Sequence, residues 1–532
     1  MLVLVMQCLA GLALILLAAG LALRLLLPLP PLEPRPASSA LTDTDDTPLG
    51  RGIATLQRQQ RPGHSGIRLL AEGQEAFAAR VLLARAAVSS LDIQYYIWHM
   101  DLSGRLMLDA VREAADRGVR VRMLLDDNGV AGMDPVLATL DQHPNIEIRL
   151  FNPFTLRTPK MLGYLADFPR LNRRMHNKSF TADGRAAIIG GRNVGDEYFG
   201  ARDGGLFFDV DVLAVGPIVG DVSRDFDRYW ASQSAYPANR ILPAIEAEHA
   251  RSLYRDLETA SQQPGAQRYI EAVRALSFLD QVMAGDLDFA WSEVRMVSDD
   301  PAKAVGKAPK ARTLLPALRA AIGTPRRDVN LISGYFVPGE AGTKALAQLP
   351  EQGVEVSILT NAFKATDVWI VHAGYAHRRK ALLSGGVRLF EMMGPAHDAP
   401  RRSLTATGSG SSIRGAGQVL RSSSTTVHAK TFVVDDARMF VGSFNFDPRS
   451  LHLNTELGFI IENPALAREV AERFAAGRAN HAYEVILADD GSLNWVEQGA
   501  NGAIVHTSEP GMSWGQRIAV RVISYLPIEW ML

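Results

Sequence analysis

An eighteen-residue signature occurs twice in this chain of 532 residues. It reads HNKSFTADGRAAIIGGRN from residue 176 and HAKTFVVDDARMFVGSFN from residue 428. Aligning the copies pairs six identical residues at identical offsets: His176 with His428, Lys178 with Lys430, Phe180 with Phe432, Asp183 with Asp435, Gly190 with Gly442, and Asn193 with Asn445. A self-similar period this long indicates two duplicated domains rather than a solenoid of short repeats.

The segments around each copy repeat in the same order. Apolar, strand-like runs at 91–98, 118–128, 145–152 and 209–217 correspond to runs at 329–336, 353–363, 386–392 and 456–464. Helical patterns at 102–117 and 340–352 separate the first two strands of each copy. Strands that alternate with helices predict β-α-β units and a sheet covered on both faces. The sequence therefore predicts an α/β fold of two duplicated domains, and two unrelated α/β domains are the disfavoured alternative.

The amino-terminal segment is apolar throughout its length. Residues 1–27 contain no charged side chain before Arg24, and about 23 apolar or small residues can cross a hydrocarbon core of about 30 Å. We expect an uncleaved transmembrane anchor, with a cleaved signal peptide as the alternative. Arg24, Arg35 and Arg51 lie only on its carboxyl-terminal side, which favours a cytoplasmic catalytic face.

The rest of the chain divides by composition. Residues 28–50 are rich in Pro, Ser, Thr and Asp and predict a flexible tether. We expect the first repeated domain over 51–290 and the second over 291–510. Residues 511–532 combine Trp514, Tyr525 and Trp530 with aliphatic residues and two arginines, which is typical of a membrane-interface segment or of a segment docked on the core.

Charge and cysteine content exclude several classes of protein. The chain has 56 Lys plus Arg against 57 Asp plus Glu, whereas a protein that binds nucleic acid through its phosphates is usually basic over at least one domain. We therefore expect no nucleic-acid partner. The single cysteine, Cys8, excludes an internal disulfide and a cysteine-built zinc site.

Two His/Lys pairs facing one pocket are suited to phosphodiester chemistry. Two lysines neutralise the nonbridging oxygens as charge develops in the transition state. One neutral histidine attacks phosphorus, and a second, protonated histidine supplies the proton of the leaving alkoxide. This chemistry requires no metal or cofactor. Carboxylates that hold each ring would supply the difference in protonation, and Glu456 and Asp209 are the candidates.

The paired H-x-K-x4-D motifs resemble those of the phospholipase D superfamily. The runs at 94–105, 190–200, 366–383 and 444–458 and the terminal LPIEWML are similar to those of bacterial cardiolipin synthases, particularly the branch called type C. The resemblance implies two phospholipase D-type α-β-α sandwich domains with one active site at their interface. It also implies an inner-membrane phosphatidyl transferase that makes cardiolipin. The acceptor is phosphatidylglycerol, and the donor is phosphatidylglycerol or phosphatidylethanolamine.

The same resemblance implies roles for individual residues. It implies that an acidic residue at the position of Glu456 orients an active-site histidine, and that Asn193 and Asn445 bind phosphate oxygens. Ser443 matches a family serine whose counterpart here is Gly191. Asp183 and Asp435 are implied to be structural. His176 is expected to be the nucleophile and His428 the general acid and then base, since in several relatives the first motif supplies the nucleophile.

Several alternatives stay open at this stage. A phospholipase D hydrolase would use water as acceptor, a superfamily nuclease would need a basic groove, and a catalytically inactive membrane adaptor would be expected to have lost motif residues. An accessory protein is neither indicated nor excluded. Asp126, Asp127 and Asn128 predict a structural loop rather than a metal cluster, and HAGYAHRRK at 372–380 predicts a solvated basic helix face, with lipid headgroup contact as the alternative.

Overall fold

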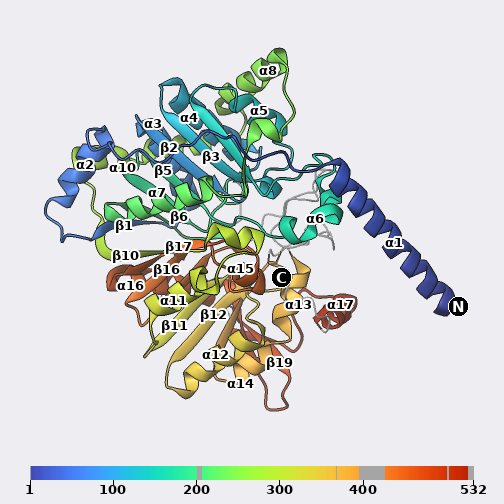
Figure 1. The fold of residues 1–532 in the computed structure, drawn as a ribbon. Helices are drawn as coiled ribbons and strands as arrows, with labels where there is room; N and C mark the ends of the chain where they lie inside the picture. Colours follow the sequence, from blue (N-terminus) through green and yellow to red (C-terminus); the bar gives the residue numbers. More distant parts are fainter. Residues whose placement is uncertain (1, 201–206, 367, 395–425, 500–501, 525–532) are drawn as a thin grey trace.

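The computed structural model describes residues 2–200, 207–366, 368–394, 426–499 and 502–524. Figure 1 shows two α/β halves stacked against each other, with a long amino-terminal helix projecting from one side. Each half is a mixed sheet with helices packed on it, and the two sheets join into one.

The sheet of the first half has eight strands. Its four central strands are formed by the motif and by residues before it, and two further strands lie on each side of them. In spatial order the strands are β9 (Ala235–Pro237), β4 (Ile146–Phe151), β3 (Arg120–Asp126), β2 (Ser90–Tyr95), β5 (Ser179–Ala182), β6 (Ala186–Gly190), β8 (Asp211–Val215) and β1 (Ser65–Leu70).

The sheet of the second half repeats this order and adds a hairpin. In spatial order its strands are β18 (Ala482–Leu487), β13 (Arg388–Met392), β12 (Glu355–Asn361), β11 (Asp328–Ser333), β15 (Lys430–Val434), β16 (Arg438–Gly442), β17 (Leu457–Glu462) and β10 (Ala290–Ser298), with β19 (Leu493–Gly499) and β20 (Gly502–His506) beyond β18. All four strand correspondences expected from the sequence are present, so the predicted duplicated α/β fold is confirmed.

The halves meet through backbone pairing and through apolar packing. β1 pairs antiparallel with β10, so the expected boundary at residue 290 falls at the first residue of the strand that joins the sheets. One hydrophobic cluster contains Ile189 and Val212 from the first half and Val441 and Phe459 from the second. Because a shared core resists relative movement, a site at this boundary is held in a fixed geometry.

Helices cover both faces of the sheets. α4 (Leu102–Asp116) begins where the Asp101 carboxylate accepts a hydrogen bond from Gly104 N, and it buries an apolar face that includes Met107 and Val111. The other helices that cover the two sheets are α3 (Gly73–Ala86), α7 (Pro217–Trp230), α11 (Leu314–Ile322), α12 (Gly339–Glu351) and α16 (Pro464–His481). The remaining helices around the two halves are α2 (Pro48–Gln57), α5 (Asp134–Leu140), α8 (Ala247–Glu258), α9 (Ala266–Ala275), α10 (Phe278–Ala284), α13 (Trp369–Ala376), α14 (Arg379–Ser384) and α15 (Pro448–His452).

The amino-terminal helix α1 (Leu2–Leu26) stands away from both sheets and contacts α6 (Gly163–Leu171) (Figure 1). Its residues Met6–Leu26 have a mean hydropathy of 2.4, and among the described residues this is the one helix long and apolar enough to cross a membrane. Length and composition therefore agree with a membrane anchor.

The segment after α1 differs from the flexible tether that its composition predicts. Arg149 and Arg122, both buried in the first half, donate hydrogen bonds to Pro36 O and Ser38 O. Arg35 donates to Ser232 O and Ala235 O. These are the contacts of a docked segment, because arginine donors of the folded half bind its backbone carbonyls.

Candidate active site

The first histidine is paired with a carboxylate from the other half. Met175 and Thr455 form a parallel backbone bridge, in which His176 N donates to Thr455 O and Thr455 N donates to Arg174 O, both at 2.9 Å. The bridge places the next residues, His176 and Glu456, side by side. His176 Nδ1 lies 2.8 Å from Glu456 Oε2.

The second histidine is paired in the mirror-image way. Two short strands, β7 (Phe207–Phe208) and β14 (Thr426–Val427), pair in parallel with Phe208 opposite Val427. The next residues, Asp209 and His428, are thereby brought together, and His428 Nδ1 lies 2.7 Å from Asp209 Oδ2. Each histidine is thus held by a carboxylate from the opposite half of the molecule.

Electrostatic coupling joins the two motifs into one cluster. The charges of Lys178, Lys430 and His428 all act on His176, and the charge of Lys178 acts in turn on His428. The side chain of His176 is 3 % exposed, whereas that of His428 is 12 % exposed. The more accessible ring is therefore that of His428.

The surroundings of His176 determine which ring nitrogen carries the proton. Nδ1 lies 3.0 Å from the carbonyl oxygen of Ser443 as well as 2.8 Å from Glu456. A carbonyl oxygen only accepts hydrogen bonds, so Nδ1 is the protonated nitrogen and donates. In the neutral ring Nε2 then holds the free lone pair, which is the form needed for attack on phosphorus.

The carboxylate supports differ between the halves. Ser443 Oγ donates to Glu456 Oε2 at 2.5 Å and accepts from Leu457 N at 3.0 Å. The serine hydroxyl therefore supports Glu456 instead of pointing to a substrate. At the equivalent Gly191, a Cβ atom would lie 2.3 Å from Asp209 Oδ1. Asp209, the shorter of the two acids, therefore lies against a glycine, which leaves room for its carboxylate.

These surroundings give the two carboxyl groups opposite pKa shifts. Burial raises the pKa of Glu456 to about 7, although Lys178 and Ser443 oppose the rise. Burial also acts on Asp209, but its hydrogen bond to His428 and the charges of His428 and Lys430 lower its pKa below the usual range. Asp209 is therefore a fixed anion, whereas Glu456 titrates near neutrality.

The histidines follow the same asymmetry. Burial, followed by the charges of Lys178 and Lys430, lowers the pKa of His176 well below its ordinary value. Burial and Lys430 also lower the pKa of His428, but Asp209 raises it. A bound phosphodiester anion would offset the lysine charges at both rings, and His428, next to a fixed anion, is the ring favoured to hold a proton.

Both lysines lie beside their own histidines. Lys178 Nζ donates to His176 O at 2.5 Å and lies 5.5 Å from the centre of the Tyr96 ring. Lys430 Nζ donates to His428 O and lies 3.1 Å from each ring nitrogen of His428. Burial lowers the pKa of Lys178 well below its ordinary value, so binding of an anion would favour its charged form.

The two asparagines each leave one amide atom unpartnered. Asn193 Oδ1 accepts from Ile97 N at 3.2 Å, while Asn193 Nδ2 and Asn445 Oδ1 are buried and have no hydrogen-bond partner among the described residues. Buried polar groups are normally paired, so Asn193 Nδ2 is suited to donating to a ligand oxygen. A half-turn of the Asn445 amide, which exchanges its oxygen and nitrogen, would let Asn445 donate in the same way.

The motif aspartates follow the last residues of strands β5 and β15, away from the histidines. Asp183 has a φ of 51° and accepts hydrogen bonds from Ser89 N and Ser90 N. Asp435 has a φ of 55° and accepts from Arg326 N and Arg327 N. Each carboxylate thus holds the turn before the neighbouring strand, which is a structural contact.

Sequence reasoning missed two aromatic residues. The Tyr96 ring lies 5.0 Å from the His176 ring, and the Tyr198 ring lies 5.1 Å from the His428 ring, both in edge arrangements. Both tyrosines lie in the runs that carry the family resemblance, QYYIWHMDLSGR and GGRNVGDEYFG, which was the available signal. They restrict how each ring is able to turn.

The polar loop at 126–128 is structural, as its position predicts. Asp126 pairs with Arg174 and accepts from Met175 N at 2.8 Å, next to His176. Asp127 pairs with Arg157 and Lys160. No group of three or more His, Cys, Asp or Glu residues is placed to hold a metal ion within the part of the chain that the structure describes.

The expectation of a solvated basic face at 372–380 is wrong for two of its residues. His372 and Arg379 are buried, and both pair with Glu509, at 2.6 and 2.8 Å respectively. Arg379 also pairs with Glu391 at 2.7 Å. The carboxylates compensate the buried cation, and no headgroup reaches these two side chains.

Comparisons with known proteins agree with this geometry. The family model described as "Cardiolipin synthase, PLD-like domain" matches residues 81–230 and 318–477. Cardiolipin synthase C of Escherichia coli (strain K12) is 45 % identical over 480 residues, which cover 89 % of this chain and 97 % of the relative. The chain belongs to the phospholipase D-like cardiolipin synthase family. It is an enzyme of the phospholipase D-type phosphatidyltransferase class.

Two further comparisons are more distant. Cardiolipin synthase A of Pseudomonas entomophila (strain L48) is 25 % identical over 451 residues, covering 84 % of this chain and 75 % of the relative. The crystal structure of phosphatidylserine synthase from Haemophilus influenzae Rd KW20 has a TM-score of 0.52 at 13 % identity, covering 82 % of this chain and 92 % of that structure. At this identity the likeness shows a shared fold alone.

Proposed function

We propose that this family member makes cardiolipin by transferring a phosphatidyl group to phosphatidylglycerol through a covalent phosphohistidine on His176. The observation that carries the proposal is the state of His176, whose Nδ1 faces two acceptors and whose Nε2 therefore holds the lone pair. The names of the relatives support the lipid class, and the apolar helix α1 supports a location beside membrane lipids.

The first half-reaction forms the covalent intermediate. His176 Nε2 attacks phosphorus, the new P–N bond forms, and the P–O bond to the donor headgroup breaks. His428, held by ionised Asp209, gives its proton to the departing alcohol oxygen. Lys178 and Lys430 stabilise the charge on the nonbridging oxygens, and Asn193 and Asn445 bind those oxygens.

The second half-reaction returns the enzyme to its starting state. His428, now neutral, takes the proton of the primary hydroxyl of phosphatidylglycerol. The hydroxyl oxygen then attacks phosphorus, the new P–O bond forms and the P–N bond breaks. His176 is regenerated neutral and His428 protonated, and no metal or cofactor takes part in the proposed sequence.

The experiment uses cells that lack cardiolipin and express this chain. With ethanolamine and glycerol isotopically labelled in separate cultures, lipid mass spectrometry should detect new cardiolipin, and the released labelled alcohol identifies the donor as phosphatidylethanolamine or phosphatidylglycerol. Phosphatidic acid without cardiolipin would instead support a hydrolase. The His428→Ala variant is the matched control and should make neither product.

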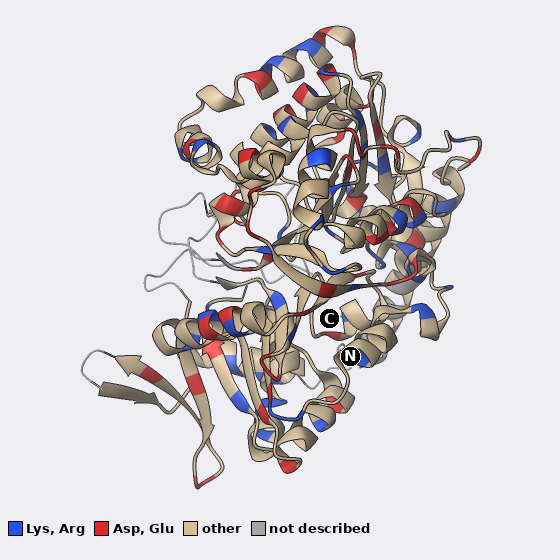
Figure 2. Ribbon diagram, turned by 90° about the vertical axis from the view of Figure 1, so that its left-hand side faces the viewer, with Lys and Arg blue, Asp and Glu red and all other residues tan. Residues whose placement is uncertain are grey.

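Charge distribution argues against nucleic acid as the substrate. Figure 2 shows Lys and Arg interspersed with Asp and Glu over both halves, and the formal net charge is −1. A groove that tracks a nucleic-acid backbone is generally lined by positive charge. A nuclease is therefore the weaker candidate.

We also propose that α1 holds the enzyme in the inner membrane with its catalytic halves on the cytoplasmic side. The support is the uninterrupted apolar helix followed by arginines only at its carboxyl-terminal end. Amino-terminal sequencing of the membrane-extracted protein should find residue 1 or 2. A mature start near residues 20–40 would show that the segment is removed.

A further inference from the structure

The segment beside α1 exposes apolar side chains. On and just before α6, Met161, Leu162, Leu165 and Phe168 are each at least 40 % exposed. Surface apolar residues are normally scattered, and a cluster of four within eight residues marks an interaction surface.

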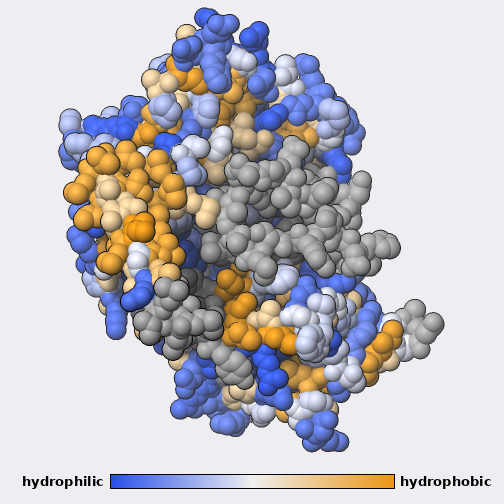
Figure 3. Space-filling model, turned by 90° about the vertical axis from the view of Figure 1, so that its right-hand side faces the viewer, coloured by the Kyte–Doolittle hydropathy of each residue, from blue (hydrophilic) through white to orange (hydrophobic). Residues whose placement is uncertain are grey.

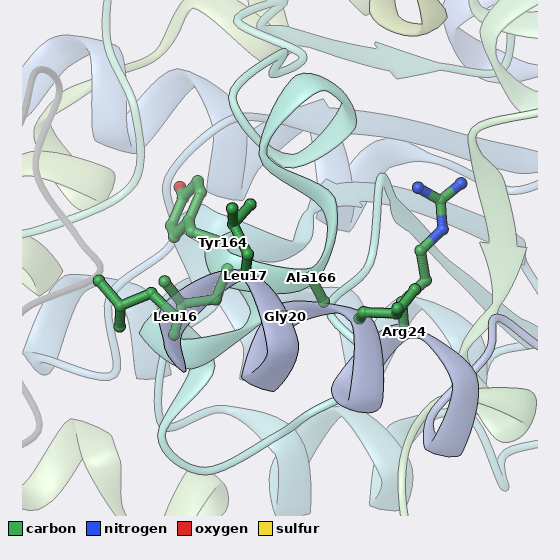
Figure 4. Close-up of a pocket in the computed structure, with 8 residues that line it drawn as sticks. Leu16, Leu17, Gly20, Arg24, Tyr164 and Ala166 are labelled. Carbon is green, nitrogen blue, oxygen red and sulfur yellow. The ribbon is translucent and has the colours of Figure 1, made fainter. Parts of the chain in front are cut away.

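Helix α1 fixes what this cluster faces. α1 crosses α6 so closely that a Cβ atom at Gly20 would lie 2.3 Å from Leu165 O. Figure 4 shows Leu16, Leu17 and Arg24 of α1 against Tyr164 and Ala166 of α6, around a cavity of about 380 Å³. If α1 spans the membrane, α6 lies beside the carboxyl-terminal half of the span, residues 16–24.

The second half contributes a matching element, α17 (Trp514–Ser524). One face of α17 packs against α13 through Val520, in a cluster with Met512, Phe363 and Ala373. The preceding Glu509 is locked to His372 and Arg379, which fixes where α17 begins. The helix is therefore docked on the protein.

The opposite face of α17 is apolar and exposed. Trp514, Ile518 and Val522, spaced four residues apart, form one stripe, and the Trp514 side chain is the most exposed at 74 %. Arg517 and Arg521 are also exposed, and within the described chain no carboxylate pairs with them. An apolar stripe with tryptophan and flanking arginines is typical of a helix lying in an anionic lipid interface.

Both elements lie on the same side of the molecule. α1, α6, α13 and α17 all lie on the right-hand side of Figure 1, and Figure 3, which looks at that side, shows apolar surface gathered on it. His176 follows Phe168 by eight positions, so their Cα atoms are at most about 28 Å apart. A surface at α6 therefore lies within that distance of the first histidine of the candidate active site.

We propose that the exposed side chains of α6 and α17 form a membrane-contact surface that seats both halves on an anionic phospholipid bilayer. Continuity with α1 and the two exposed arginines of α17 favour a lipid surface over a protein partner. The inference rests on the proposed membrane span of α1. It adds that one docked element from each half touches lipid, so the enzyme does not swing freely from its anchor.

The test places an environment-sensitive fluorophore at single cysteines in the full-length protein. Leu165→Cys and Ile518→Cys are made in a Cys8→Ser background and reconstituted into vesicles of phosphatidylglycerol and phosphatidylcholine. Ala54→Cys is the matched control, because Ala54 is exposed and lies on α2, on the opposite side of Figure 1. A separate protein, which keeps native Cys8 in α1 as its single cysteine, carries the label that reports insertion of the anchor.

Labels at 165 and 518 should show blue-shifted emission, quenching by lipid-borne nitroxide and protection from iodide, whereas the label at 54 should behave as in water. Replacing both Arg517 and Arg521 by Gln should reduce the lipid quenching at 518 but not at 165. A label at 165 or 518 that behaves like that at 54 overturns the proposal. In that case the Cys8 label shows whether α1 has also failed to insert. Cardiolipin synthesis is measured separately, so a failure of this proposal is distinguished from a failure of the proposed function.

Discussion

The two histidine–carboxylate pairs share one backbone design and differ in chemistry. In both, a short parallel pairing between the halves places a histidine next to an acid of the other half. The His176 pair is buried, with a titrating Glu456 supported by Ser443, whereas the His428 pair is more accessible, with a fixed anion at Asp209. Duplication thus supplied a symmetric frame, and a few side chains made one ring the nucleophile candidate and the other the proton carrier.

The largest loss of activity is expected when either lysine is removed, which tests what the two pairs have in common. Lys178→Ala and Lys430→Ala should each lower kcat/KM by about a hundredfold or more, because each loses a group that stabilises transition-state charge. The measurement is steady-state transfer with lipid substrate, and circular dichroism checks folding. Folded variants that keep most of their activity would contradict a shared phosphate site.

A smaller but still large loss is expected for Gly191→Ser, which imposes the second half's residue on the first. The new Cβ would meet Asp209 Oδ1 at 2.3 Å and displace the carboxylate from His428. Loss of a hydrogen bond to a charged group costs about 1.5–3 kcal/mol, which corresponds to roughly ten- to a hundredfold in rate. Ser443→Gly is the matched control and should lose less.

The substitution Glu456→Gln tests the titration of the first pair. Activity of the unmodified enzyme should fall as the pH drops through about 7, because protonated Glu456 no longer stabilises the charge that develops on His176. Glu456→Gln should lack this acid limb and should be about tenfold less active at pH 8, since it lacks an interaction of about 1.4 kcal/mol.

The same variant should respond oppositely in stability. The folded-state pKa of Glu456, about 7, lies above its unfolded value, so its contribution to stability is present at low pH and is lost as the pH rises through 7. Glu456→Gln should therefore raise Tm at pH 8, by roughly 1 °C for each kcal/mol gained in a chain of this length, and not at pH 5. An unchanged Tm at both pH values would show that Glu456 titrates normally.

The smallest effect is expected for Ser443→Ala. The hydroxyl donates to Glu456 and favours its ionised form, so its removal should raise the pKa of Glu456 and move the acid limb to higher pH. Because Glu456 is about half ionised at pH 7, loss of a hydrogen bond of about 1 kcal/mol predicts roughly a threefold loss of activity at that pH. The pH–rate profile separates this from substrate binding by Ser443, which would lower activity equally at every pH.

Much of the fold was predictable because its signals are local. Alternating strands and helices around each motif set the order of β2, β3 and β4 and of their counterparts β11, β12 and β13, and the structure confirms it. The motif residues were found because the sequence repeats them. Their assembly into one cluster follows from duplication, since each half alone holds only one His/Lys pair.

What sequence did not predict depends on contacts between distant residues. Nothing near Asp209 indicates that it serves His428 of the other half, because the pairing of Phe208 with Val427 is a tertiary contact. The docking of 35–38 depends on buried Arg122 and Arg149, and the burial of His372 and Arg379 depends on Glu509. The composition of a segment gives the residues of that segment, but it does not show which distant residues bind its carbonyl groups or balance its charges.

The most direct test of the account is to trap the covalent intermediate in each histidine variant. A nitrophenyl phosphodiester has a leaving group that needs little protonation, so a nucleophile acts on it without a general acid. His428→Ala should accumulate a phosphohistidine on residue 176, detected by rapid quench and mass spectrometry under alkaline conditions, while His176→Ala should accumulate none. An adduct on residue 428 in the His176→Ala protein would contradict the account and reverse the roles of the two pairs.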